Sequence, residues 1–79
     1  MTSTRTSETR DQSIALFRHN LKRLRREHFL SQRDLAKLLG MHQSAIARIE
    51  CGWHLPSFDL ACRIADALYV DLSEFREKT

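Results

Sequence analysis

Glycine and proline are scarce in this sequence, with two Gly and one Pro among 79 residues. No stretch alternates β-branched and polar residues in the manner of a strand, whereas Leu, Ala, Arg and Glu, which favour helices, are common. No apolar run is long enough to span a membrane, and residues 1–12 lack the apolar centre of a signal peptide. These absences predict an all-α domain in the cytoplasm.

Cysteine is equally scarce. Cys51 and Cys62 lie in what the pattern indicates is one helical unit, so we expect reduced thiols and no disulfide. Cys51 and His54, with His42 nearby, have the Cys-x-x-His spacing of half a zinc site, but no second such pair lies close in sequence. No nucleophile–base arrangement and no P-loop is present. The sequence therefore predicts no metal, no cofactor and no enzymatic activity.

Basic charge is concentrated in one segment. Five basic residues and one acidic residue lie between positions 18 and 28, a net charge of +4, whereas the whole chain carries +3. Residues 57–79 hold five acidic and three basic residues, so the opposite end is acidic. A basic end is typical of a protein that binds a polyanion such as nucleic acid, although a charged helix face is more often simply solvated.

Helical periodicity begins after residue 12. Residues 1–12 hold no apolar side chain after Met1, so we expect a disordered leader before a domain over residues 13–79. An apolar stripe at 14, 17, 21 and 24 indicates a first helix, capped by Ser13 or Asp11 and ending near His28. The expected helices cover residues 13–28, 32–39, 43–51, 58–68 and 71–78.

The second and third helices are short and close together. Ser31 and Asp34 form a short version of the capping box at the start of the second. Gly40 ends the second helix, Gly52 ends the third, and only about three residues separate the two, as in a helix–turn–helix. The inner-face candidates are Leu35, Ala36, Leu38 and Leu39, then Ala45, Ile46 and Ile49, and in the fourth helix Phe58, Ala61, Cys62, Ala65 and Leu68.

An ordered set of residues between Leu21 and Phe75 resembles one known family, the lambda-repressor/Cro-like or XRE helix-turn-helix proteins. The resemblance implies an all-α domain of five helices, with the second helix across the DNA backbone and the third in the major groove. The matching residues are Leu24-Arg25, Leu30-Ser31-Gln32, Asp34-Leu35-Ala36, Leu39-Gly40, Ile46, Ile49-Glu50, Gly52, Pro56-Ser57, Ile64-Ala65, Leu68 and Leu72.

The sequence departs from this family at three places. Phe29 and Tyr69 stand where relatives usually carry Gly after a helix, so each either adopts a costly left-handed conformation or shifts the helix end. The loop after Gly52 usually offers Lys or Arg to phosphates. Here it holds Trp53 and His54.

Four residues on the third helix are candidates for base contact. Gln43, at the helix start, can form two hydrogen bonds to the edge of adenine, and relatives often contact a base from this position. Arg48 can reach guanine or a phosphate, Ser44 a base edge or a phosphate, and Ala47 only a thymine methyl group. The alternative for each polar residue is a solvated helix surface.

Contacts to the DNA backbone are expected around these helices. Gln32 can meet a phosphate at the N-terminus of the second helix, and in similar proteins it also braces the first residue of the third. The family pattern pairs Arg25 with Glu50 in a partly buried, mainly structural salt bridge. The backbone-contact candidates are Gln32, Arg25, Arg33, His42, Trp53 and His54, with Lys37 as a weaker one.

These observations favour a sequence-specific transcriptional regulator, a repressor more than an activator. A single helix-turn-helix contacts few base pairs, so we expect a homodimer on a palindromic operator. The alternative is an antitoxin or another protein-interaction module, for which a toxin-binding segment would be expected beyond the short leader and tail. The expected dimer surface is Tyr69, Val70, Leu72 and Phe75.

Overall fold

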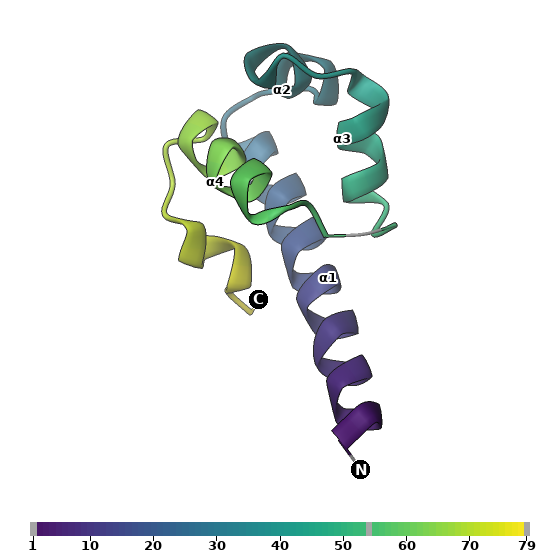
Figure 1. The fold of residues 1–79 in the computed structure, drawn as a ribbon. Coiled ribbons are helices and arrows are strands. Elements are labelled where there is room, and N and C mark those ends of the chain that lie inside the picture. The colour runs from purple at the N-terminus through teal and green to yellow at the C-terminus, as the bar shows by residue number, and fades with distance from the viewer. Residues whose placement is uncertain (1, 54, 79) are drawn as a thin grey trace.

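The computed structural model describes the backbone of residues 2–53 and 55–78, with side chains from residue 11 onward. Four α-helices and one 3₁₀ helix make up these residues, which contain no strand (Figure 1). The elements are α1 (Thr2–Glu27), α2 (Gln32–Leu39), α3 (Gln43–Glu50), α4 (Phe58–Ala67) and η1 (Leu72–Arg76). No helix within this part of the chain is both long and apolar enough to cross a membrane.

Helix α1 is the longest element, with 26 residues. Its C-terminal half lies among the other helices, and its N-terminal part extends away from them (Figure 1). The helix begins at Thr2, earlier than the expected cap at Ser13 or Asp11, and so includes residues expected to form a disordered leader. A helix that is already nucleated by buried residues can extend through polar ones, since each added residue gains a hydrogen bond.

Local signals set the bounds of α2. Ser31 accepts a hydrogen bond from the Asp34 amide, and the Asp34 carboxylate accepts one from the Ser31 amide, so the predicted capping box is present. Gly40 ends the helix at φ 66°. Arg63 of α4 donates a 2.6 Å hydrogen bond to the Leu39 carbonyl, which satisfies one of the free acceptors at this helix end.

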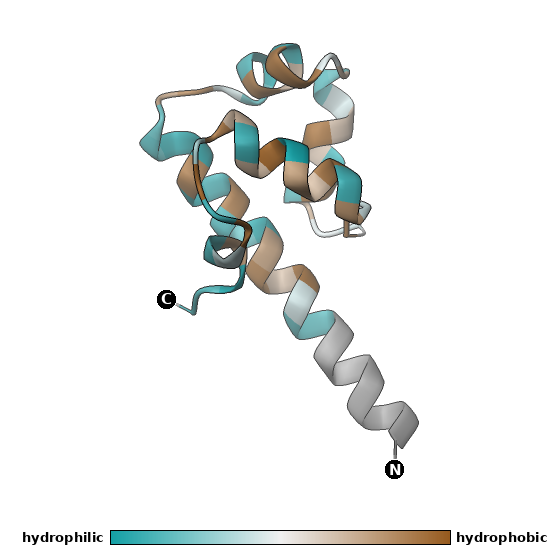
Figure 2. Cartoon of the chain, turned by 60° about the vertical axis from the view of Figure 1, so that its left-hand side comes forward, coloured by the Kyte–Doolittle hydropathy of each residue, from teal (hydrophilic) through white to brown (hydrophobic). Residues whose placement is uncertain are grey.

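One apolar core lies between the helices, each of which carries both hydrophobic and hydrophilic residues (Figure 2). Two inner-face predictions are wrong. Leu38 is 61% exposed and Phe58 is 76% exposed, because the narrow inward faces of α2 and α4 are already filled by their neighbours. The core residues are Phe17, Leu21, Leu24, Leu35, Ala36, Leu39, Ile46, Ile49, Ala61, Ile64, Ala65, Leu68 and Phe75.

The predicted fifth α-helix is a five-residue 3₁₀ helix, η1. Asp71 caps it by accepting from the Ser73 amide, and the Glu74 amide bonds to the Asp71 carbonyl in the i to i+3 pattern. The expectation of five α-helices is therefore wrong. So short a segment gains too few i to i+4 hydrogen bonds to offset the cost of nucleating an α-helix.

Segment η1 is fixed to α1 by an aromatic stack and by hydrogen bonds from one buried side chain. The rings of Phe17 and Phe75 stack with centroids 4.7 Å apart. Asn20, fully buried, donates to the carbonyls of Phe75 and Glu77 at 3.0 and 2.9 Å. Nothing in the sequence singled out Asn20, because its partners lie more than fifty residues away in the chain.

Phe29 and Tyr69 take the left-handed conformation, with φ 56° and 57°. The sequence left open a left-handed conformation or a shifted helix end, and the left-handed conformation is the one found. Both side chains are exposed, so each ring gains little burial in exchange for the backbone strain.

Candidate nucleic-acid interface

Helix α3 has two unlike faces. Ile46 and Ile49 are buried, whereas Gln43, Ser44 and Arg48 are exposed. Ala47, the remaining residue expected to contact a base, is partly buried. The four residues thus lie on the side of α3 that turns away from the core. Ala47 contributes only a methyl group to this side, and the other three contribute polar groups.

The start of α3 carries little side-chain capping. His42 is the N-cap residue by its backbone, and its exposed side chain makes no cap hydrogen bond. Free backbone N–H groups and the helix dipole make such a terminus favourable for an anion. His42 therefore stays a candidate for phosphate contact and does not cap the helix through its ring.

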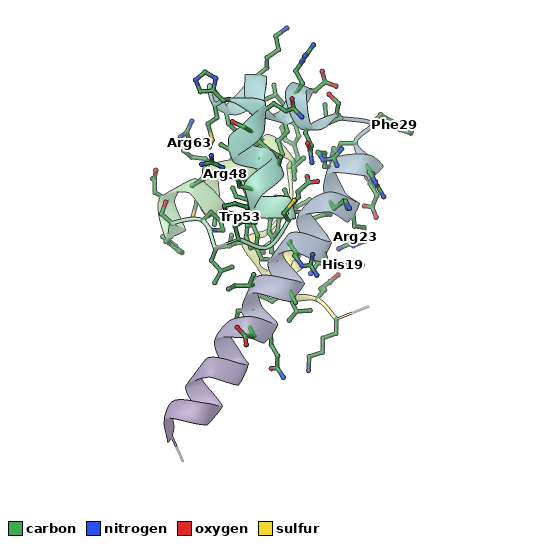
Figure 3. The ribbon with its side chains drawn as sticks, turned by 90° about the vertical axis from the view of Figure 1, so that its right-hand side faces the viewer. His19, Arg23, Phe29, Arg48, Trp53 and Arg63 are labelled. Atoms are coloured by element: carbon green, nitrogen blue, oxygen red, sulfur yellow. The ribbon has the colours of Figure 1, made fainter. Side chains whose placement is uncertain are left out.

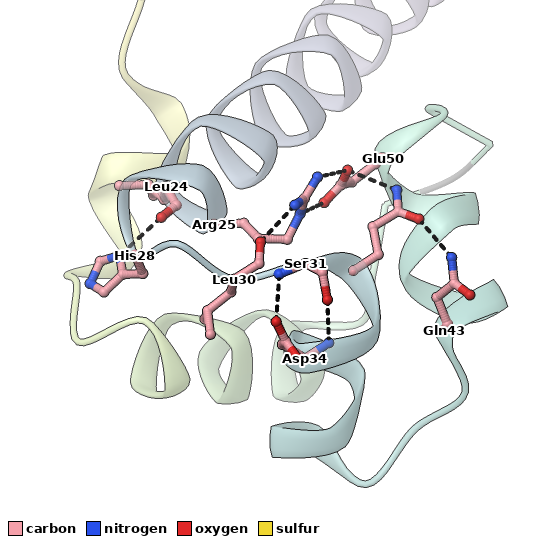
Figure 4. Close-up of polar contacts among 9 residues, drawn as sticks. Leu24, Arg25, His28, Leu30, Ser31, Asp34, Gln43 and Glu50 are labelled. Atoms are coloured by element: carbon pink, nitrogen blue, oxygen red, sulfur yellow. Dashed lines mark hydrogen bonds and ion pairs between the residues drawn. The ribbon is translucent and has the colours of Figure 1, made fainter.

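A chain of hydrogen bonds connects Gln43 to the interior (Figure 4). Gln43 donates through Nε2 to Oε1 of Gln32 at 3.1 Å, and Gln32 donates through Nε2 to Oε1 of Glu50 at 3.0 Å. Arg25 donates to both Glu50 oxygens, from Nε at 2.6 Å and from Nη2 at 2.9 Å. The remaining guanidinium nitrogen of Arg25 donates to the Leu30 carbonyl at 2.8 Å. We call the side chains of Gln43, Gln32, Glu50 and Arg25 the polar relay.

The inner half of the polar relay is buried and ionised. The side chains of Arg25 and Glu50 are only 9% and 2% exposed. Burial by itself would raise the pKa of Glu50, but hydrogen bonds from Arg25 and Gln32, together with the charges of Arg25 and Lys22, lower it below its ordinary value. The hydrogen bond to Glu50 raises the pKa of Arg25, against the opposite effect of burial. The pair ties α1 to α3 and to the start of α2.

Trp53 lies beside the far end of α3 and is 74% exposed. The guanidinium carbon of Arg48 lies 6.0 Å from the centre of the Trp53 ring, so the two side chains meet on one surface (Figure 3). Trp53 therefore does not anchor the loop in the core. The contact with Trp53 holds the Arg48 side chain on the side of the molecule where Gln43 and Ser44 are exposed.

The glycine that follows α3 is favoured by its left-handed backbone conformation. Gly52 has φ 81°, and a Cβ at this position would lie 2.9 Å from Cδ of Arg18. Arg18 thus approaches the C-terminal end of α3, a contact that the sequence did not suggest. Its charge and those of Lys22 and Arg25 come from one helix and lie near α3.

The other predicted contact residues surround this surface. Arg33 and Lys37 are exposed on α2, and Gln32 is partly buried because it belongs to the polar relay. His54 lies outside the described residues. Cys51 and Cys62 are free thiols, and the part of the chain described holds no group of three potential metal-ligating side chains.

The predicted dimer surface is only partly exposed. Tyr69 is exposed, and Val70 and Leu72 are partly buried against the core. Phe75 is 1% exposed, so its place in a dimer surface is wrong. The reason is that Phe17 needs an apolar partner at this end of the core, and the turn of η1 brings Phe75 there.

Comparison with known proteins identifies the family. The model of the helix-turn-helix domain family matches residues 16–77. The ImmF control region 10 kDa protein of Bacillus phage phi105 is 40% identical over 53 residues, which cover 67% of this chain and 59% of that protein. An uncharacterized HTH-type transcriptional regulator of Methanocaldococcus jannaschii is 40% identical over 57 residues, which cover 72% of this chain and 86% of that protein. The chain belongs to the helix-turn-helix domain family and has an XRE-like sequence pattern.

Proposed function

We propose that this protein is a sequence-specific DNA-binding transcriptional regulator that inserts α3 into the major groove. The observation that carries the proposal is the exposed row of Gln43, Ser44 and Arg48 on a helix whose opposite face is buried. Membership of the helix-turn-helix family and a relative named as a transcriptional regulator support the same function. The major groove admits a helix and presents a distinct pattern for each base pair.

Each residue of the row has a defined role in this proposal. Gln43 forms two hydrogen bonds with adenine, and Arg48 contacts the O6 and N7 atoms of guanine. Ser44 contacts a base edge at the same end of the helix, and the Ala47 methyl group contacts a thymine methyl group. The cation–π contact with Trp53 limits the rotamers of Arg48 and so lowers the entropy lost on binding.

Phosphates are contacted on both sides of α3. The N-terminus of α2, with Gln32 and the exposed Arg33, faces one strand, and the N-terminus of α3, with His42, adds a second such site. Trp53, at the far end of α3, donates its indole N–H to a phosphate or packs against a sugar. Arg25 contributes chiefly its charge, because three of its five N–H groups bond inside the protein and its side chain is only 9% exposed.

The protein acts as a repressor and binds a palindromic operator as a homodimer in this proposal. Two recognition helices about 34 Å apart double the number of base pairs contacted, which one small domain needs to find its site. The dimer surface centres on the exposed Tyr69 with Val70 and Leu72, without Phe75. This surface lies in the acidic C-terminal part of the chain, so a partner subunit leaves the basic α1 segment free.

A protein-interaction module such as an antitoxin is the second candidate, and one observation favours it. A groove of about 620 Å³ lies between α1, the start of α4 with the segment before it, and η1, and its apolar lining includes Leu16, Leu55, Phe58 and Leu72. Such a groove suits a partner segment. The exposed polar row on α3 has no role in that alternative.

Selection of bound sites from random duplex DNA tests the proposal. We expect enrichment of a single palindromic site whose half-sites are about one helical turn apart, with two copies of the protein bound. Enrichment without symmetry, with one copy per site, would reject the homodimer and keep the DNA contact. No enrichment, together with capture of a protein partner that loses affinity on Phe58→Lys, would favour the interaction module.

A further inference from the structure

Glu50 lies between Arg25 and Gln32 in the polar relay, and its carboxylate fixes the direction of the hydrogen bonds on both sides. Arg25 can only donate hydrogen bonds, and an ionised carboxylate can only accept them. Glu50 therefore requires the Nε2 group of Gln32, which it binds at 3.0 Å. The Oε1 atom of Gln32 is then turned outward, where it accepts from Nε2 of Gln43 at 3.1 Å.

The outer edge of Gln43 is determined by this order. One N–H of its amide is used by Gln32, so one N–H and the Oε1 atom remain for DNA. Adenine presents an acceptor at N7 and a donor at N6 in the major groove, and these complement the remaining N–H and Oε1.

The reversed order would favour another base. If Gln32 instead donated to the Oε1 atom of Gln43, both N–H groups of Gln43 would face the groove. Two donors complement the O6 and N7 acceptors of guanine. An amide that is free to flip would therefore discriminate poorly between adenine and guanine.

We propose that Glu50, which lies too deep to contact DNA, is a specificity-determining positioning residue that makes Gln43 prefer adenine over guanine. It acts through Gln32, and Arg25 keeps its carboxylate ionised and in place. The proposal rests on the proposed function, because it assumes that Gln43 contacts a base. It adds that a buried ion pair, whose evident role is to hold α1 and α3 together, also sets a base preference.

The test measures base preference at one operator position. That position is the one at which the Gln43→Ala variant no longer distinguishes between base pairs. Affinity is then measured for two duplexes that carry A·T or G·C at that position. The wild-type protein should bind the A·T duplex more tightly by a factor between about 5 and 150, the range that a bidentate contact provides. Glu50→Gln, of nearly the same shape, should lose most of this ratio while the preferences at other positions stay unchanged.

A second variant avoids any loss of folding from an unpaired Arg25. Gln32→Met breaks the polar relay between Gln43 and Glu50 and leaves the Arg25–Glu50 pair intact, so it should lose the same ratio. The matched control is Glu27→Gln, which removes one charge from an exposed pair with Arg23 and touches none of the relay. A purely structural role would lower the affinity for both duplexes equally and leave their ratio unchanged.

Three outcomes would overturn the proposal. Retention of the wild-type ratio by Gln32→Met and by a folded Glu50→Gln, while Gln43→Ala loses it, would remove the role of Glu50 and leave DNA binding by α3 intact. A wild-type preference for G·C at this position would show that the relay runs in the other direction. Unchanged preferences in Gln43→Ala at every position would reject base contact by Gln43 and the proposal with it.

Discussion

Helix α1 joins the rest of the molecule in two chemically different ways. Toward η1 it uses an aromatic stack between Phe17 and Phe75, backed by Asn20. Toward α3 it uses the ion pair of Arg25 and Glu50, which is equally well buried. The aromatic stack removes apolar surface from water and depends little on exact geometry, and only the Asn20 hydrogen bonds beside it are directional. The ion pair is directional, and a buried pair of this kind contributes little net stability compared with an apolar replacement.

This difference indicates a division of roles. The apolar junction stabilises the fold, and the ionic junction fixes how α3 and its exposed side chains are presented. The two junctions should therefore respond differently to the same kinds of substitution.

The largest effect should follow a change in the apolar junction. Phe75→Ala should lower the free energy of unfolding by about 3–5 kcal/mol, because it removes a buried ring and leaves a cavity against Phe17. Thermal or denaturant unfolding measures this loss. Phe58→Ala is the control, since Phe58 is largely exposed and should cost much less. Equal losses in the two variants would show that Phe75 is not a core residue.

Breaking the ionic junction on one side should cost nearly as much. Arg25→Ala should lower the free energy of unfolding by about 3 kcal/mol, because it leaves the Glu50 charge buried without its partner. Glu27→Ala, which removes the exposed partner of a surface pair with Arg23, should cost less than about 1 kcal/mol.

Replacing both partners sharpens the contrast. Arg25→Met with Glu50→Leu should recover most of the stability lost in the single variant, because neither charge remains buried. Poor recovery would contradict the view that this junction mainly positions α3.

The ionic junction should also respond to pH. The pKa of Glu50 in the folded protein lies below the ordinary value of 4.5. Its stabilising effect is therefore complete above about pH 4.5 and is lost as the pH falls through the lower, folded-state pKa. The Tm difference between wild type and Glu50→Gln should be constant near neutral pH and shrink in acid. A difference that grows in acid would reverse the assigned direction of the shift.

Much of the fold could be predicted because its signals are local. The capping box of Ser31 and Asp34, the left-handed Gly40 and the apolar stripe of α1 each involve residues a few positions apart. The pairing of Arg25 with Glu50 followed from the family resemblance and not from local pattern.

The remainder depended on three-dimensional context. Gln32 meets Glu50, and Asn20 meets the carbonyls of η1, only after the helices have packed. Leu38 and Phe58 fit the apolar pattern, yet a core this small has no room for them. The sequence pattern could not predict the type of helix at η1, because a capped apolar segment can form either a 3₁₀ helix or an α-helix.

The smallest predicted effect lies outside both junctions. Phe29→Gly should stabilise the protein by up to about 1 kcal/mol, because it relieves the left-handed strain at φ 56° and loses almost no buried surface. Denaturant unfolding would show it as a raised midpoint. Tyr69→Gly relieves the same strain at a residue of the proposed dimer surface. Loss of dimerisation in Tyr69→Gly but not in Phe29→Gly would show that the Tyr69 side chain contacts the partner subunit.

DNA binding by wild type and Gln43→Ala tests the central claim that the exposed row on α3 contacts bases. Affinities are measured for the selected duplex and for random duplex DNA over a range of salt concentrations. We expect wild-type affinity to fall steeply with salt, and Gln43→Ala to lose about 1–3 kcal/mol on the selected duplex with almost no loss on random DNA. A salt dependence near zero, or equal losses on both duplexes, would contradict the account.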